Sequence, residues 1–206
     1  MQTFTQKTFN IGELKSISTK SIEEHLKLYV GYVKNTNLVL EKIEKLTQTS
    51  DVKGSQTSDV ENIYLLGELF RRFSFEYNGM RNHEIYFNTL SEGAKLLSEN
   101  SELKQTLIET FGSLEKFIID FKTIAMTRGI GWAVLWYDKN DKKLLASWVD
   151  EQHLGQLNGC EMILALDMWE HAYIYDFPSS EKKKYIEAFF ENLNWEAVEK
   201  NFIDTQ

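Results

Sequence analysis

Two long stretches with helical periodicity, joined by a polar segment, most restrict the folds open to this chain. The first runs from Ser18 to about Lys45, and Ser18 is a suitable N-cap. Its apolar positions recur at near-helical spacing and are Ile22, Leu26, Tyr29, Val33, Leu38 and Ile43. The second runs from about Val60 to Leu90, and the polar segment TQTSDVKGSQTSDV (47–60) is expected to be a solvated loop between them. Two such stretches predict an antiparallel helical hairpin.

The pattern changes near residue 93. Residues 101–111 and 113–126 look helical, with Ser113 as the cap of the second helix. GWAVLWYD (131–138) and KKLLASWVD (142–150) flank a polar turn as a predicted β-hairpin, and the apolar run ending at Leu166 supplies a third strand. A terminal helical stretch over 182–202 follows Pro178. The sequence therefore predicts an α+β fold. Residues 1–92 form an N-terminal helical hairpin domain, and residues 93–206 form a C-terminal domain with a three-stranded antiparallel sheet and flanking helices.

Composition narrows the classes of function. The 206 residues are 42% hydrophobic, which is enough for a sizeable core. A net charge of -8 argues against a broad nucleic-acid surface, which needs clustered Lys and Arg. The opening residues, MQTFTQKTFN, lack an apolar run of signal-peptide length, and no uncharged stretch is long enough to span a membrane. We therefore expect a soluble, cytoplasmic protein. Its one cysteine, Cys160, excludes an internal disulfide.

Four histidines are the first candidates for chemistry. His25 and His83 lie on or beside the apolar faces of the two hairpin helices, and His153 and His171 belong to the second half. A single histidine on such a face is more often packed and bonded to a carboxylate. Two facing helices can, however, each direct one ligand into the space between them, as helical bundles with metal sites do. The pair therefore favours a metal site.

The segment DMWEHAYIYDF (167–177) directly follows the apolar run MILAL. Asp167 stands at the end of a predicted buried strand, so it and His171 are separated by a turn and can converge. A carboxylate buried there needs a cation or strong donors, because an unpaired buried charge is costly. Three imidazoles and one carboxylate suit iron, manganese or zinc. A mononuclear non-haem iron oxygenase and a non-enzymatic metal-binding protein both remain open at this point.

Several motifs resemble one known family, the iron/manganese superoxide dismutases. DMWEHAY (167–173) is similar to that family's signature, an Asp-x-Trp-Glu-His-Ala-Tyr run. RGIGW (128–132) resembles its Gly-Ser-Gly-Trp segment, and NHEIYFNTL (82–90) and YIEAFFENLNWEAV (185–198) resemble its second ligand helix and C-terminus. These motifs occur in the family's order and spacing from about Ser16 to Phe202. The resemblance implies disproportionation of superoxide to dioxygen and hydrogen peroxide.

The resemblance also implies how a metal is held. The ligands would be His25, His83, Asp167 and His171, with water or hydroxide as a fifth, around one manganese or iron ion per subunit. Manganese-type members have a glycine four residues before the second ligand, which is Gly79 here, and a glutamine from the C-terminal half. We expect this glycine to leave room above the solvent ligand. The combination favours manganese, with activity with either metal left open.

The resemblance further implies residues that surround the metal. Tyr32 would be the gateway tyrosine, Gln152 the outer glutamine that hydrogen-bonds the solvent ligand, and Trp132 and Trp169 aromatic walls of the site. Glu170 would reach the equivalent of His171 in a second subunit, so a homodimer is expected.

The chain departs from the family pattern in four places. Residues 1–15 replace the family's usual proline-rich opening. Leu28 stands where common members have a gateway histidine, and Ile174 replaces the tyrosine that bonds that histidine across the dimer. Replacing both hydrogen-bond partners by apolar residues can leave the stability nearly unchanged, whereas replacing only one leaves the other without a partner at a cost in free energy. Lys182 falls where the family often has an arginine near the entrance, and we expect it to attract the anion.

Overall fold

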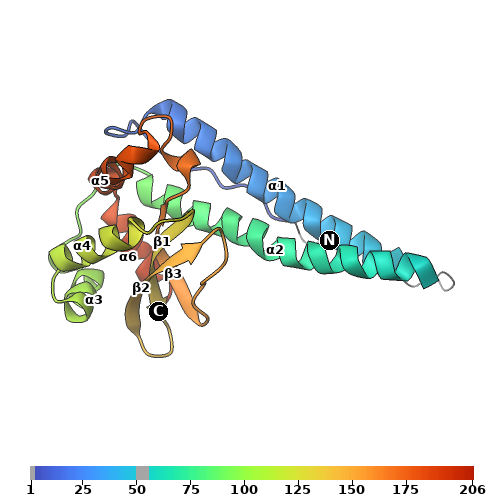
Figure 1. Ribbon diagram of the computed structural model, residues 1–206. Helices are drawn as coiled ribbons and strands as arrows, with labels where there is room; N and C mark the ends of the chain where they lie inside the picture. The colour runs from blue at the N-terminus through green and yellow to red at the C-terminus, as the bar shows by residue number, and fades with distance from the viewer. Residues whose placement is uncertain (1–2, 50–55) are drawn as a thin grey trace.

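The two long helices form the predicted antiparallel hairpin (Figure 1). The structure is a computed structural model that describes residues 3–49 and 56–206. Helix α1 spans Thr19–Thr49 and helix α2 spans Gln56–Leu90. The Ser18 hydroxyl oxygen accepts a hydrogen bond from the Ser21 amide at 3.1 Å, so the predicted cap is confirmed.

Both helices continue into the segment 47–60, which was wrongly predicted to be loop throughout. The Thr47 hydroxyl donates to the carbonyls of Ile43 and Glu44, each at 2.9 Å. A hydroxyl bonded in this way remains inside a helix, so a polar composition does not by itself end one. The remainder of the predicted loop, 50–55, lies outside the described residues.

The N-terminal segment lies along the hairpin rather than apart from it (Figure 1). The Asn37 side chain accepts from the Phe4 amide at 2.8 Å and donates to the Phe4 carbonyl at 2.9 Å. The Lys7 amide donates to the Tyr29 hydroxyl at 2.8 Å, and the Phe9 ring packs 5.7 Å from the Tyr29 ring. Residues that match nothing in the family's pattern thus cover the hairpin.

The predicted sheet is confirmed, with strand order β2-β1-β3 and antiparallel pairing throughout. Strands β1 (Gly131–Asp138), β2 (Lys143–Asp150) and β3 (Cys160–Asp167) are eight residues each. β1 is the central strand and is buried along nearly its whole length. Trp132 pairs with Asp167, so the entry of the central strand lies beside the end of β3.

Helices α3 (Glu102–Phe111) and α4 (Leu114–Ala125) contact the sheet, and the Ser113 cap of α4 is confirmed by a 3.0 Å bond from the Lys116 amide. Two short 3₁₀ helices, η1 (Glu170–Ala172) and η2 (Ser179–Glu181), follow β3. The fold class is therefore α+β, as predicted.

The C-terminal helical stretch is divided, unlike the single stretch that we expected. Helix α5 (Lys182–Asn192) ends before Leu193, and helix α6 (Trp195–Ile203) begins after Asn194. The Asn194 side chain caps α6 and donates to the Ser91 carbonyl at 2.7 Å. Lys95 exchanges backbone hydrogen bonds with Leu193 and Trp195 on either side. Contacts from distant residues therefore fix the break.

One continuous hydrophobic core joins the hairpin to the sheet and includes Tyr29, Phe87, Trp132 and Leu164. The division into domains at residues 92 and 93 stays a prediction. No helix within 3–49 or 56–206 has the length and apolar character to cross a membrane.

Candidate metal centre

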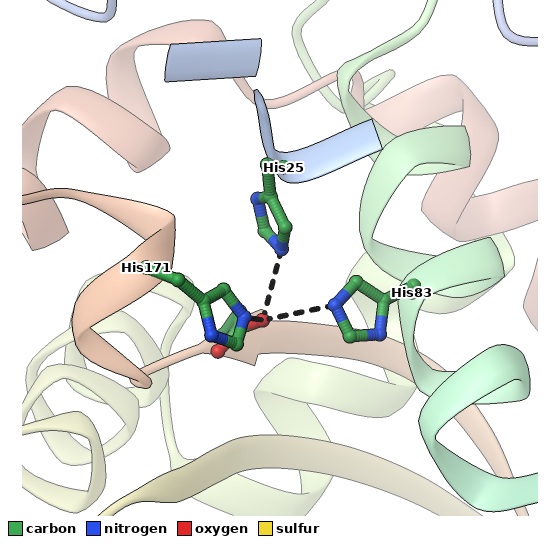
Figure 2. Close-up of side chains that lie close together, drawn as sticks. His25, His83 and His171 are labelled. Atoms are coloured by element: carbon green, nitrogen blue, oxygen red, sulfur yellow. Dashed lines mark hydrogen bonds and ion pairs between the residues drawn. The ribbon is translucent and has the colours of Figure 1, made fainter. Parts of the chain in front are cut away.

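Three imidazoles and one carboxylate converge where the hairpin meets the end of β3. His25 comes from α1, His83 from α2, Asp167 from the last position of β3 and His171 from η1 (Figure 2). One ligand-capable atom from each of the four lies within 4.8 Å of the others. His25, His83 and Asp167 are buried, and the His171 side chain is 22% exposed. The sequence-predicted ligand set is thus brought together in space.

The turn after β3 determines how Asp167 and His171 meet. The Met168 amide donates to the Gly131 carbonyl at 2.8 Å, which keeps the chain beside the sheet for one further residue. The Trp169 amide then donates to Asp167 Oδ1 at 2.8 Å. This bond turns the chain into η1 and leaves Asp167 Oδ2 directed at the imidazoles.

Asp167 Oδ2 is the centre of the cluster. The Nε2 atoms of His25, His171 and His83 lie 3.1, 3.2 and 3.5 Å from it. Burial alone would raise the pKa of the Asp167 carboxyl, but the charge of His171 and the hydrogen bonds from His171 and His25 hold that pKa well below its usual range. Burial lowers the pKa of His25, and it lowers the pKa of His83 to about 3. An ionised carboxylate thus faces the neutral imidazole of His83, and burial also disfavours the charged form of His25.

The hydrogen bonding of His83 shows that a cation fits this cluster. His83 Nδ1 lies 2.6 Å from the Gly79 carbonyl oxygen, so Nδ1 carries the proton and donates it. The neutral ring then has a bare lone pair at Nε2, which has no hydrogen-bond partner among the described residues and faces Asp167 Oδ2. Two buried lone pairs directed at one another are unfavourable unless a cation lies between them. Metal-binding histidines are typically oriented by such a bond from the other ring nitrogen.

A second chain of hydrogen bonds runs beside the cluster. Gln152 is fully buried; its Nε2 donates to the Tyr32 hydroxyl at 3.0 Å, and its Oε1 accepts from Trp132 Nε1 at 3.0 Å. The Asn82 side chain donates to the Gln152 carbonyl, also at 3.0 Å. Burial raises the pKa of the Tyr32 phenol far above its ordinary value, and the charge of Asp167 raises it further. Tyr32 therefore remains a neutral phenol at physiological pH.

The two predicted tryptophans contact the imidazoles. The Trp132 ring is 5.0 Å from the His83 ring, and the Trp169 ring is stacked 5.7 Å from the His171 ring. Two further aromatic neighbours of His25 were missed from the sequence: Tyr86 at 5.0 Å and Phe87 at 4.8 Å. They follow His83 by three and four positions on α2, and this helical spacing was the signal that could have revealed them.

The space above Gly79 is filled, contrary to the expectation that this glycine leaves room above a solvent ligand. A Cβ atom at Gly79 would lie 2.5 Å from Cδ1 of Tyr32. The glycine therefore admits the Tyr32 ring, which lies 5.0 Å from the His83 ring.

The remaining predicted residues lie at the surface around the cluster or away from it. Glu170 is exposed and accepts a hydrogen bond from the Ser179 hydroxyl at 3.1 Å, and Leu28 and Ile174 are both exposed. Lys182 donates to the Thr127 carbonyl at 3.0 Å and does not line the cavity that contains Tyr32 and His171. The role of Lys182 at the entrance therefore stays a prediction.

The known proteins that this chain resembles are enzymes whose names include iron or manganese. Residues 99–201 match the family model of the C-terminal domain of iron/manganese superoxide dismutases. The chain is 34% identical over 191 residues to a superoxide dismutase [Fe] of Aquifex pyrophilus, covering 92% of this chain and 85% of the relative. It is 30% identical over 200 residues to a mitochondrial superoxide dismutase [Mn] of Glossina morsitans morsitans, covering 95% and 86%. It is 34% identical over 178 residues to a superoxide dismutase [Mn/Fe] of Aeropyrum pernix, covering 85% and 78%.

Proposed function

The chain belongs to the iron/manganese superoxide dismutase family, and from this premise we propose that it disproportionates superoxide at one manganese or iron ion. The observation that carries the proposal is the bare Nε2 of His83 facing the buried carboxylate of Asp167. With His25 and His171, these side chains offer three imidazole nitrogen ligands and one carboxylate oxygen ligand. Such a mixed set suits either metal.

Either metal, when bound, supplies a one-electron couple between its trivalent and divalent states, so that one superoxide is oxidised to dioxygen and a second, with two protons, is reduced to hydrogen peroxide. The Asp167 carboxylate offsets one positive charge of the ion. Burial of the cluster keeps competing water ligands few, and the hydrogen bond from His83 to the Gly79 carbonyl fixes one ligand ring in its binding tautomer.

Tyr32 and Gln152 are proposed to handle protons. Because Gln152 Nε2 already donates to the Tyr32 hydroxyl oxygen, the phenol's own proton remains free to donate into the cavity. The raised pKa of Tyr32 keeps that proton in place until a strongly basic acceptor arrives. Trp132 Nε1 donates to the side-chain oxygen Oε1 of Gln152 and so fixes which end of the amide faces Tyr32.

Manganese is the proposed physiological metal, with iron as an alternative that also supports activity. The presence of Gln152 in the C-terminal half together with Gly79 is the combination that favours manganese. A displacement of about 60 mV changes a one-electron equilibrium tenfold, so small changes around the ligands decide which metal cycles. The names of the relatives include Fe, Mn and Mn/Fe enzymes and favour no single choice.

The test is reconstitution of metal-free protein with manganese and with iron separately, followed by metal analysis and a superoxide-removal assay. Activity with manganese, with or without activity with iron, is the expected result. Full metal binding without superoxide removal would instead favour a non-enzymatic metal-binding protein, and metal-dependent oxidation of an organic substrate would favour an oxygenase.

A two-fold homodimer around Glu170 and His171 is part of the proposal. Glu170 is exposed next to His171, so its carboxylate can reach the same region of a second copy. Self-complementary two-fold contacts are the commonest arrangement in oligomers. Glu170→Ala should weaken the dimer and lower metal retention. An active monomer at all concentrations in sedimentation would contradict this arrangement.

A further inference from the structure

A cavity of about 300 Å³ lies against the metal centre and contains an ion pair that the proposed mechanism does not use. Tyr32, Trp169 and His171 line it together with Arg72 and Glu76. Since His171 belongs to the ligand cluster, this cavity adjoins the proposed metal site. Arg72 and Glu76 lie on α2, one turn apart.

The guanidinium of Arg72 is held in place from two sides. Its Nε donates to Glu76 Oε1 at 2.7 Å, and its Nη2 lies 2.6 Å from the same oxygen. The guanidinium carbon lies 4.0 Å from the centre of the Phe75 ring, within the range of a cation–π contact. No group among the described residues accepts from Nη1, and the Arg72 side chain is 45% exposed. A fixed guanidinium thus keeps two N–H donors available to the cavity.

The partner of Arg72 is placed differently. Glu76 is only 3% exposed, and its second oxygen, Oε2, is buried without a hydrogen-bond partner in the described parts of the chain. The pair therefore has an exposed cation and a buried anion. An anion that enters the cavity from solvent is therefore closer to the guanidinium of Arg72 than to the carboxylate of Glu76, so attraction by the cation exceeds repulsion by the anion.

Other cations near the cavity are less suited to this task. Lys27 also lines the cavity, but its ammonium pairs with Glu24 at the exposed surface at 2.7 Å. Lys182 is bonded to the Thr127 carbonyl and lies over the Trp148 ring. With a net charge of -8, the chain as a whole repels anions, so attraction requires a local positive group.

We propose that Arg72, held by Glu76 and Phe75, attracts and orients small monovalent anions at the mouth of the metal centre. The site rests on the geometry of the pair, and the identification of its anion as superoxide rests on the proposed function. Arginine suits this role better than lysine because its planar donors recognise anions from a fixed position.

The kinetic test compares Arg72→Gln with Arg71→Gln in protein of equal metal content. Arg71 is the adjacent residue, pairs with the exposed Glu68 and does not line the cavity. Arg71→Gln therefore removes the same charge at a position outside the cavity. Arg72→Gln should lower kcat/KM for superoxide about fivefold at low ionic strength, and the difference should shrink at high salt. Arg71→Gln should change it by less than about 1.5-fold.

Glu76→Gln provides a test of sign. Removing the buried negative charge while keeping an acceptor for Arg72 should raise kcat/KM about twofold, whereas the control Glu68→Gln should leave it unchanged. Decreases in both Arg72→Gln and Glu76→Gln that are restored in the double variant would show a purely structural pair and overturn the proposal. A large loss in Glu76→Gln alone would identify Glu76 as a proton donor and would also overturn it.

A binding measurement separates this inference from the proposed function. Zinc binds such ligands without redox chemistry, so bromide can be titrated into zinc-loaded protein while the arginine side-chain Nε–Hε signals are followed by NMR. A saturable shift of the Arg72 signal, absent for Arg71, supports the anion site even if the protein removes no superoxide. An active enzyme in which neither the Arg72 signal nor the Arg72→Gln rate differs from its Arg71 counterpart refutes the site and leaves the proposed function intact.

Discussion

Substituting Gly79 by alanine tests the packing that positions Tyr32. The added Cβ would lie 2.5 Å from Cδ1 and 2.6 Å from Cε1 of the Tyr32 ring. Carbon atoms at optimal separation are about 3.5 to 4.0 Å apart, so the ring must retreat by about 1 Å. The Tyr32 hydroxyl lies 3.0 Å from Gln152 Nε2, and a shift of that size lengthens this bond beyond a useful range.

The expected cost follows from three contributions. Overpacking costs about 1 to 3 kcal/mol, and loss of the hydrogen bond costs about 1 kcal/mol. Replacing glycine by alanine within a helix returns about 1 kcal/mol. The net loss is about 1 to 3 kcal/mol. For a chain of this size, each kcal/mol changes Tm by about 2 to 4 °C, so the centre of the range is a decrease of about 6 °C.

Thermal unfolding of Gly79→Ala should therefore be measured beside Gly67→Ala. Gly67 is in the same helix, and a Cβ there meets nothing within 4 Å. Gly67→Ala should leave Tm unchanged or raise it slightly. A double-mutant cycle with Tyr32→Ala adds a second check, because removing the ring should abolish the cost of alanine at position 79.

The reasoning fails if Gly79→Ala is as stable as Gly67→Ala and retains the bond between Tyr32 and Gln152. It also fails if the cost of Gly79→Ala is the same in the Tyr32→Ala background. Either result would show that the ring does not depend on the glycine.

Three further predictions concern the cluster and the fold. His171→Ala should lose most bound metal and activity, because three ligands hold a redox metal poorly, and metal analysis of the purified variant checks this. Metal-free protein should lose stability as pH falls from about 6.5 towards 3. In this range the unfolded chain binds a proton at His83, whereas the folded chain, in which His83 has a pKa of about 3, does not. Urea unfolding measures the free energy of unfolding across this range, and a value that does not change with pH would contradict the prediction. Asn194→Ala should destabilise the protein by about 1 to 3 kcal/mol, because it removes the α6 cap and the bond to the Ser91 carbonyl. A free energy of unfolding equal to that of the wild type would show that neither bond contributes to stability.

Features that depend on residues close together in the chain could be predicted from the sequence. Apolar spacing predicted the hairpin helices, because that pattern follows from the helical period. Two strand-like runs that flank a polar turn predicted β1 and β2. Ser18 and Ser113 were identifiable as caps, since a cap bonds an amide three residues away. The segment DMWEHAY predicted that Asp167 and His171 converge, because only one turn separates them.

Contacts between residues that are far apart in the chain depend on how the helices and strands pack. His25 and Asp167 are 142 residues apart, and only the packing of α1 against the end of β3 places their polar atoms within 3.1 Å. The division of the C-terminal stretch depends on Asn194 and its bond to Ser91, 103 residues earlier. Likewise, the Tyr32 ring fills the space above Gly79, on the opposite helix of the hairpin. Local periodicity contains no information about these contacts, because each depends on the side chain that the completed fold places opposite.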